Sequence, residues 1–299
     1  MAEHIPVLLQ ETIAMLNVHP GQTVIDGTLG AGGHSSVLCE RLGEKGKLIA
    51  FDTDAGAIAV ARERLSSCPC HITIINENFR TMDAACARES VQTVDAVLLD
   101  LGFSSLQIEV SGRGFSFMRD EPLLMTLTDS VREETLTARE IVNEWGEESI
   151  ADVIYGYGEE RYARRIAKGI VEAREDAPIE TTGQLVDIIK GSVPRVYASG
   201  KIHPATRTFQ ALRIAVNDEL ATAEEGIRKG IALLAPGGRI AVISFHSLED
   251  RIVKRLFKEE EANGRITILT KKPVAPSDEE VKRNPRARSA KLRVAEKMA

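Results

Sequence analysis

The stretch Asp26-Gly27-Thr28-Leu29-Gly30-Ala31-Gly32-Gly33-His34 decides the fold that this sequence predicts. It follows a short β-branched run at residues 23–25 and precedes a segment in which Val37, Leu38 and Leu42 can share one helical face. Glycines at a strand-to-helix turn let the chain turn tightly and leave the first N–H groups of the helix open to a ligand. The stretch therefore predicts a strand, a loop for a nucleotide-like cofactor and a helix, with a purely structural turn as the alternative.

Further apolar runs continue this pattern. Residues 48–51, 72–75 and 94–99 have the composition of strands buried on both faces of a parallel sheet. Between the first two runs, Ile58, Ala61 and Leu65 recur at helical spacing. Strands and helices that alternate in this way predict right-handed crossovers and a doubly wound sheet.

The alternation stops after Asp100 and resumes about a hundred residues later. The intervening segment predicts helices at 138–145, 159–173 and 182–189. The α/β pattern then predicts a long helix over 211–234, a turn at 236–238, a strand over 239–245, a helix over 248–260, and strands over 266–270 and 289–296. In the last strand Leu292 and Val294 alternate with Lys291 and Arg293, which predicts an antiparallel strand with one side in water. We therefore expect a doubly wound α/β domain made of residues 1–106 and 211–299, interrupted by an all-helical domain over 107–210.

Composition limits the class of protein. The 299 residues are 43% hydrophobic and 27% charged, with a formal net charge of −6, which suits a folded soluble protein. No apolar run approaches the roughly 18 residues that span a bilayer, and the start lacks a signal-peptide pattern, so we expect no membrane partner and a cytoplasmic location. Residues 251–299 hold 14 Lys or Arg and 7 Asp or Glu. This basic tail on an acidic body suggests a polyanionic partner, with a merely solvated tail as the alternative.

The four cysteines predict neither a disulfide framework nor a metal site. Cys39, Cys68, Cys70 and Cys86 are few and irregularly spaced, and Cys68-Pro69-Cys70 does not have a zinc-ligand spacing. We expect reduced, structural thiols and no metal.

Asp52 is the second candidate cofactor residue. It follows the second predicted strand, 20 residues after Gly32, where an acid can accept hydrogen bonds from both hydroxyls of a ribose. Asp54 is better explained as the N-cap of the helix that follows.

Two enzyme classes place an adenosine on such a sheet: nicotinamide-dependent dehydrogenases and S-adenosylmethionine-dependent methyltransferases. Ser35 occupies the position where the dinucleotide fingerprint needs its third glycine. Asp26 would repel a pyrophosphate but attract a sulfonium or ammonium group. The residues therefore favour a methyltransferase.

Asp100, at the end of the fourth predicted strand, is the candidate catalytic residue. The exocyclic amine of a base is a poor nucleophile because its lone pair is delocalised into the ring. A carboxylate that accepts a hydrogen bond from this amine would raise its electron density and align it with the methyl group. The alternative is that Asp100 only binds the cofactor or caps a turn.

Several long motifs carry a resemblance to a known family. They are Asp26 to Ser35, Asp100 to Gln107, Arg113 to Phe117, Gly158 to Arg161, His203 to Gln210, Ile243 to Arg251 and Asn284 to Ser289. Together they resemble the bacterial 16S rRNA (cytosine-N4)-methyltransferases, the family called RsmH or MraW, nearly from end to end. The resemblance implies a Rossmann-like class I methyltransferase sheet with an inserted all-helical domain for substrate recognition, and S-adenosyl-L-methionine as cofactor. It also implies methylation of a cytidine in the decoding region of the small ribosomal subunit, as free 16S rRNA or in a late assembly particle. No obligate protein partner is evident.

The resemblance also implies a set of cofactor contacts: Gly32, Gly33, His34, Asp52, Phe79, Asp100 and Gln107. Local structure offers an alternative for three of them. His34 could serve the helix start, Phe79 could be a core residue, and Gln107 could be an ordinary loop residue. His246 is a second catalytic candidate that would touch the flipped base or its ribose, and a structural histidine is the alternative.

The RNA contacts are predicted from basic and aromatic side chains. Arg161, Arg164, Arg165 and Lys168 lie on one predicted helix and recur at three and four residues, so we expect them to share a face. Arg207, in the stretch from His203, and the tail from Lys282 to Arg293 add positive charge, and Trp145 stacks on a base or closes the helical core. A solvated basic face is the alternative reading of the helix and the tail.

One segment departs from the family pattern. Where relatives usually continue Gly-Pro-Leu-Asp-Met-Arg-Met, this chain has Glu121-Pro122-Leu123-Leu124-Met125-Thr126-Leu127, and Phe103 replaces a smaller valine. An acid and a base are lost there, which affects substrate positioning more than cofactor binding. The departure favours one other hypothesis, a cofactor-retaining rRNA-binding assembly factor that does not catalyse.

Overall fold

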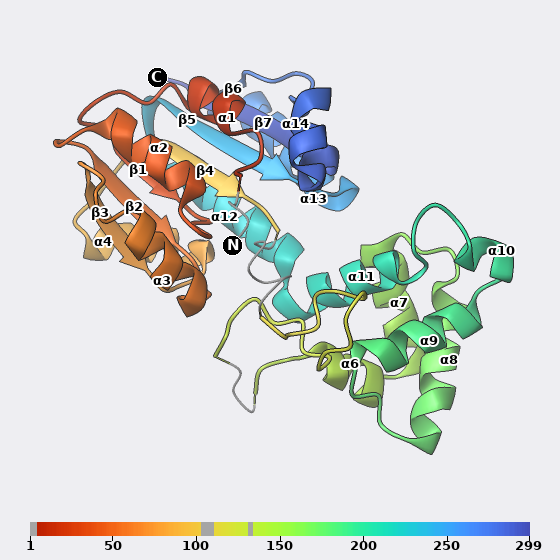
Figure 1. The fold of residues 1–299 in the computed structure, drawn as a ribbon. Helices are drawn as coiled ribbons and strands as arrows, with labels where there is room; N and C mark the ends of the chain where they lie inside the picture. The colour runs from red at the N-terminus through yellow and green to blue at the C-terminus, as the bar shows by residue number, and fades with distance from the viewer. Residues whose placement is uncertain (1–4, 103–110, 131–133) are drawn as a thin grey trace. The chain divides into compact units, whose positions relative to one another are not determined.

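The structure is a computed structural model that describes residues 5–102, 111–130 and 134–299. The chain forms two compact units. The first unit comprises Met1–Gly102 and Leu220–Ala299, and the second comprises Phe103–Glu219 (Figure 1). Gln107 and Phe103, two residues singled out from the sequence, lie outside the described residues.

A seven-stranded sheet forms the centre of the first unit, in the order β3-β2-β1-β4-β5-β7-β6. The strands are β1 (Thr23–Asp26), β2 (Lys47–Phe51), β3 (His71–Ile75), β4 (Val94–Asp100), β5 (Leu234–Ser244), β6 (Ile266–Ile268) and β7 (Lys291–Lys297). β1 to β5 pair in parallel, and β7 runs antiparallel to both β5 and β6. The parallel strands end at one edge, so β1, β2 and β4 deliver Asp26, Asp52 and Asp100 to the same side of the sheet.

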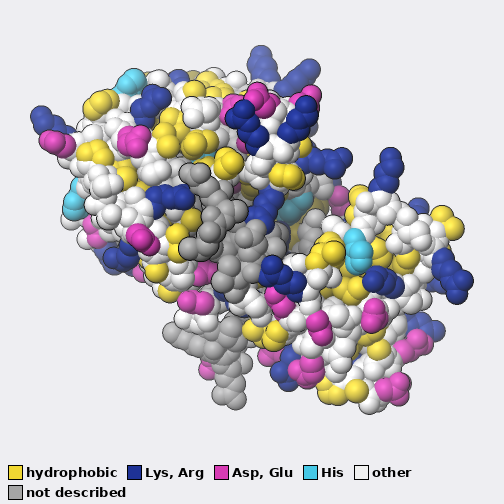
Figure 2. All heavy atoms as spheres, viewed as in Figure 1, with side chains coloured by type: hydrophobic (Ala, Val, Ile, Leu, Met, Phe, Trp, Pro, Cys, Tyr) yellow, Lys and Arg dark blue, Asp and Glu magenta, His cyan; other side chains and the backbone are white. Residues whose placement is uncertain are grey.

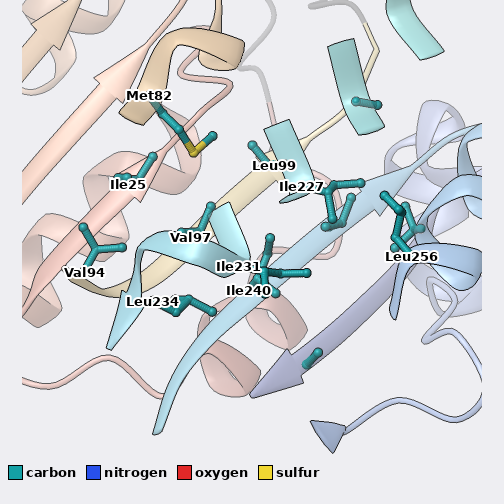
Figure 3. Packing of buried hydrophobic residues seen from close by; sticks show 14 of the residues in the cluster. Ile25, Met82, Val94, Val97, Leu99, Ile227, Ile231, Leu234, Ile240 and Leu256 are labelled. Atoms are coloured by element: carbon teal, nitrogen blue, oxygen red, sulfur yellow. The ribbon is translucent and has the colours of Figure 1, made fainter. Parts of the chain in front are cut away.

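Helices cover both faces of this sheet because its strands are apolar on both sides. The helical elements of the first unit are α1 (Leu9–Leu16), α2 (Gly33–Leu42), α3 (Ala55–Arg64), η1 (Phe79–Thr81), α4 (Met82–Arg88), α12 (Glu219–Leu233, whose first residue is counted with the second unit), α13 (Ser247–Ala262), α14 (Asp278–Arg283) and η2 (Pro285–Ser289). Residues of α4, α12 and α13 pack on Ile25, Val97 and Leu99 of the strands (Figure 3). Residues of α1 and α2 pack on the opposite face, against Val24 and Leu98.

The second unit is helical. Its described helices are α6 (Ala138–Glu144), α7 (Glu147–Gly158), α8 (Ala163–Asp176), α9 (Thr182–Ser192), α10 (Arg195–Ala198) and α11 (Ala205–Asn217). They enclose a separate apolar core that includes Ile141, Ile166 and Leu212. Within the described residues this unit contains no strand of the sheet, only an isolated bridge between Pro122 and Thr181.

Three details of the sequence prediction are wrong. The long helix over 211–234 is two helices, α11 and α12, because Asp218 adopts a left-handed backbone conformation (φ 48°) that ends α11. Arg161 precedes α8, so it does not share a helix with Lys168. Both sides of β7 are buried, because Arg293 is covered and its guanidinium pairs with the Asp250 carboxylate at 2.7 Å.

The cysteines also differ from expectation. Cys39 on α2 and Cys70, which directly precedes β3, form a disulfide, so the prediction of reduced thiols is wrong for this pair. Cys68 and Cys86 are free. No helix in the described ranges has both the length and the apolarity needed to cross a bilayer.

Candidate active site

The glycine loop has the backbone geometry that the sequence predicted. Gly32 sits before α2 with φ 77°, a left-handed conformation that favours glycine, and Gly30 has φ 51°. A Cβ on Gly33 would lie 2.4 Å from the ring of Pro6. The loop therefore needs glycine both for its turn and for the close approach of the N-terminal segment.

Asp52 closes the loop onto β2. Its Oδ2 accepts a hydrogen bond from the Gly30 N–H at 2.8 Å, and its Oδ1 accepts one from the Asp54 N–H at 2.9 Å. Burial raises the pKa of Asp52 to about 6, although the two backbone hydrogen bonds lower it. A carboxylate still has lone pairs left after two such bonds, so Asp52 retains acceptor capacity for hydroxyl groups. Asp54 caps α3 through the Gly56 and Ala57 N–H groups, as predicted.

Two carboxyl groups meet at the ends of the neighbouring strands β1 and β4. Asp26 is buried, and its Oδ2 accepts a hydrogen bond from the Ser35 hydroxyl at 2.7 Å. The Asp100 N–H donates to the Thr28 hydroxyl at 2.6 Å, which fixes the end of β4 against the loop. Oδ1 of Asp100 is buried and has no hydrogen-bond partner among the residues that the structure describes.

Burial raises the pKa of Asp100 well above its ordinary range, and the negative charges of Asp26 and Glu249 raise it further. Burial likewise raises the pKa of Asp26, while its hydrogen bonds with Ser35 and Thr28 lower it. A cation placed beside these two groups would relieve their repulsion and satisfy the open oxygen of Asp100. The same groups would repel a pyrophosphate, which argues against a dinucleotide here.

His34 stands at the start of α2 and faces Asp100. Its Nε2 lies 3.1 Å from the Val7 carbonyl oxygen, and its Nδ1 lies 3.7 Å from Oδ2 of Asp100. The ring is buried, so it is held by both contacts rather than by solvent.

Phe79 lies close to the loop but is also part of the core. Its ring packs against the apolar cluster on the α12 face, and a Cβ on Gly226 of α12 would come within 2.3 Å of it. The Cβ of Phe79 lies 3.0 Å from the position that a Cβ on Gly27 would take. The predicted cofactor contact therefore comes from a side chain that α12 also holds in place.

His246 is engaged by its own helix. It is the N-cap of α13: its Nδ1 accepts from the Glu249 N–H, and its Nε2 lies 3.2 Å from the Glu249 carboxylate. Glu249 is buried, and its Oε2 accepts from the N–H of Phe245 at 2.7 Å. This arrangement agrees with the structural alternative for His246, and its catalytic role stays a prediction.

Glu249 is a site residue that sequence reasoning missed. It fixes His246, and its charge acts on Asp100. The signal was present, because a capping residue followed three positions later by Glu at a helix start is the capping-box spacing.

The candidate RNA residues outside the basic tail lie in the second unit. Arg164 and Arg165 are exposed on α8, whereas Lys168 pairs with the Glu172 carboxylate at 3.5 Å. The Arg161 guanidinium lies 4.9 Å from the rings of Tyr162 and Tyr197. Figure 2 shows Lys and Arg interspersed with Asp and Glu on the face in view, so no single field of positive charge covers it.

The other predicted RNA residues have structural partners. The Arg207 guanidinium donates to the Glu159 carbonyl oxygen at 2.9 Å. Trp145 ends α6 half-buried against the helical core, which agrees with a core role. The His203 ring stacks on Phe117 with centroids 4.6 Å apart. The basic tail is not merely solvated, since β7 within it is a strand of the sheet.

Comparisons of the sequence with a family model and with curated proteins point to one family. The model of the MraW methylase family matches residues 1–298. The protein named ribosomal RNA small subunit methyltransferase H of Geobacter sulfurreducens is 49% identical over 99% of both chains, and the protein of that name from Heliobacterium modesticaldum is 46% identical over 99% of this chain and 98% of its own. A crystal structure of an rRNA methylase from Streptococcus thermophilus aligns with a TM-score of 0.47 and 12% identity, covering 100% of this chain and 99% of that one.

Proposed function

The chain belongs to the MraW methylase family, and from this premise we propose that it is an S-adenosylmethionine-dependent methyltransferase acting on N4 of a cytidine in small-subunit rRNA. The names of the relatives support rRNA as the substrate. The carboxyl groups at the ends of the strands support the amine of a base as the methyl acceptor. We infer that the enzyme acts in the cytoplasm, on free 16S rRNA or on an assembling small subunit.

Asp100 is the observation that carries the proposal. Its Oδ1 is buried without a described partner at the end of β4, where the neighbouring strand and the glycine loop end. An acceptor in that position fits the N–H of an exocyclic amine and raises the electron density on its nitrogen. Holding that nitrogen in line with the methyl group lowers the entropic part of the barrier.

The residues around the loop fit the cofactor. When bound, S-adenosylmethionine supplies an electrophilic methyl group on a positively charged sulfur. The carboxyl groups of Asp26 and Asp100 suit its cationic atoms, and Asp52 suits its ribose hydroxyls through its remaining lone pairs. Gly32, Gly33 and His34 line the loop, and Phe79 and Gln107 complete the proposed contacts.

All the proposed RNA contacts except His246 come from the second unit. The target base must leave its stack to reach Asp100, at a cost of a few kcal/mol that is smallest in irregular RNA. Arg161, Arg164, Arg165, Lys168 and Arg207 neutralise backbone phosphates, and Trp145 and His246 are the proposed contacts to the base or its ribose.

The non-catalytic assembly factor is not favoured. Its support was the divergent segment from Glu121 to Leu127, and this segment is used for folding. Of the changed residues, Glu121 accepts a hydrogen bond from the Gly114 N–H on a carboxylate oxygen at 3.0 Å, and Thr126 is buried, with its hydroxyl donating to the Thr128 carbonyl oxygen at 3.0 Å. These two changed residues therefore have a role in folding that leaves Asp100 and the loop intact.

The test is methyl transfer to small-subunit rRNA. We expect radiolabelled methyl to enter the RNA and nucleoside analysis to identify N4-methylcytidine. Asp100→Ala should abolish turnover with a modest loss of cofactor affinity, whereas Asp52→Ala should chiefly weaken cofactor binding. Equal kcat for Asp100→Ala and wild type would remove the amine-acceptor role, and absence of transfer on every rRNA preparation would return the assembly-factor hypothesis.

A further inference from the structure

We propose that His34 is a positioning residue that acts through Asp100: the two side chains form a pair that carries away the proton released when the amine is methylated. The inference rests on the proposed function and adds to it the destination of that proton.

The hydrogen bond of His34 with Val7 determines which ring nitrogen carries the hydrogen and which has the lone pair. A carbonyl oxygen can only accept, so the contact of Nε2 with the Val7 oxygen at 3.1 Å requires that Nε2 carry the hydrogen. In the neutral ring, Nδ1 then has the lone pair, and it lies 3.7 Å from Oδ2 of Asp100. Val7 thus orients a proton acceptor toward the carboxyl group.

The surrounding charges favour a proton in this pair. Asp26 on β1 and Glu249 on α13 both act on Asp100, and together with burial they raise its pKa. On the side of α3, the Arg64 guanidinium approaches to 3.4 Å from the position that a Cβ on Gly33 would take. Asp52 acts on Asp26 rather than directly on the pair. A protonated imidazole beside an ionised Asp100 is stabilised by the attraction between the two opposite charges.

The chemistry requires such an acceptor. The lone pair of N4 forms the bond to the methyl carbon while the carbon–sulfur bond breaks and its electrons remain on sulfur. The nitrogen then bears a positive charge until one N–H proton leaves. The Asp100 carboxylate accepts this proton, and Nδ1 of His34 takes it over, leaving an imidazolium next to a carboxylate. The proton passes to solvent after the products leave, which restores both groups.

The experiment compares His34→Gln with wild type. Glutamine can donate to the Val7 oxygen as Nε2 does, but it cannot hold the proton. We expect kcat at neutral pH to fall about 10- to 100-fold, with a smaller rise in the KM for S-adenosylmethionine, and the acidic limb of the kcat profile to move to lower pH, because the imidazole no longer takes up the first proton. The control is Glu40→Gln, an exposed position on the same helix, which should behave as wild type. An unchanged pH profile with full kcat in His34→Gln would overturn the proposal.

A second measurement observes the His34 ring directly and leaves His34 itself unchanged. In wild type labelled with ¹⁵N-histidine, the chemical shift of Nδ1 of His34 in the cofactor-free protein at neutral pH should be that of a nitrogen with a lone pair. As the pH is lowered, Nδ1 should become protonated in a titration that is coupled to Asp100. This coupling should be partly lost in Asp100→Asn. Protonated Nδ1 with a bare Nε2 at neutral pH would contradict the geometry. Failure of wild type to transfer methyl at all would count against the proposed function, whereas active wild type with an indifferent His34 would count against this inference alone.

Discussion

At the scale of single residues, Asp52 shows burial and hydrogen bonding acting in opposite directions on one carboxyl group. Burial prevails, so the pKa in the folded protein is about 6 against an ordinary 3.8. Between these two values the folded state holds a proton that the unfolded state has lost. Stability contributed by this group is therefore present below pH 3.8 and is lost as the pH rises to about 6.

The first prediction follows from that sign. Two pKa units correspond to about 3 kcal/mol of free energy. The free energy of unfolding of wild type should therefore fall by up to this amount between pH 4 and pH 6.5, and that of Asp52→Asn should not. Urea unfolding of the cofactor-free protein measures it as the difference between variant and wild type at each pH. The amide also mismatches one backbone N–H, but this cost is the same at every pH. A difference that stays flat across the range would refute the assigned pKa.

The second prediction concerns Gly226 in α12. Alanine is normally favoured over glycine in a helix by about 1 kcal/mol. Here its Cβ would meet the Phe79 ring at 2.3 Å, so Gly226→Ala should instead destabilise the protein by about 1–3 kcal/mol. Phe79→Leu should relieve much of this cost, and a double-mutant cycle measures the coupling. Additive effects would mean that the ring and the helix do not constrain each other.

Several side-chain roles could be predicted from the sequence because they are local. Asp54 as an N-cap depends only on the residues that follow it. The partner of Arg293 could not be predicted in this way, because Asp250 is remote in sequence and meets it only when α13 and β7 pack. The same limit applies to Glu249, whose influence on Asp100 depends on two elements meeting in space.

At the scale of elements, the disulfide joins α2 to the segment before β3. The third prediction is that, without reductant, two thiols react with a thiol reagent in denaturant, from Cys68 and Cys86, and that all four react after reduction. With a sequence separation of 31 between the paired cysteines, a chain-entropy model gives about 3–4 kcal/mol of stabilisation. Urea unfolding with and without reductant measures it. Four reactive thiols before reduction would contradict the pairing.

The strands were the most predictable elements. Each of the first four is a short apolar run whose period and composition allow little else, and the structure contains all four. The break at Asp218 was not predictable, because apolar periodicity continues on both sides of it and only the backbone angle ends the helix. The burial of the second side of β7 was not predictable, because that side carries charged residues that the structure covers and pairs.

At the scale of the whole molecule, two apolar cores divide the chain into a sheet unit and a helical unit. The sequence indicated both, because strand and helix alternation stops after Asp100. The units divide at 102/103 and 219/220, whereas the sequence placed the boundaries at 106/107 and 210/211. The second difference arises because α11 packs on α7 and completes the helical core, which no local pattern announces.

The last prediction tests the helical unit as the RNA-binding part of the molecule. Each cation that neutralises a phosphate of single-stranded RNA contributes about 0.7 to the slope of log K against log salt. Arg164 and Arg165 are exposed, and no ion pair is recorded for them within the described ranges, so replacing both by Ala should weaken binding to small-subunit rRNA and lower this slope by about 1.4. Lys168→Ala is the matched control on the same helix, and it should have a smaller effect because Glu172 already neutralises this lysine. Filter binding at several salt concentrations gives the slopes. Equal slopes for wild type and the double variant would contradict the proposal that α8 binds RNA. They would not affect the proposed methyl transfer at Asp100.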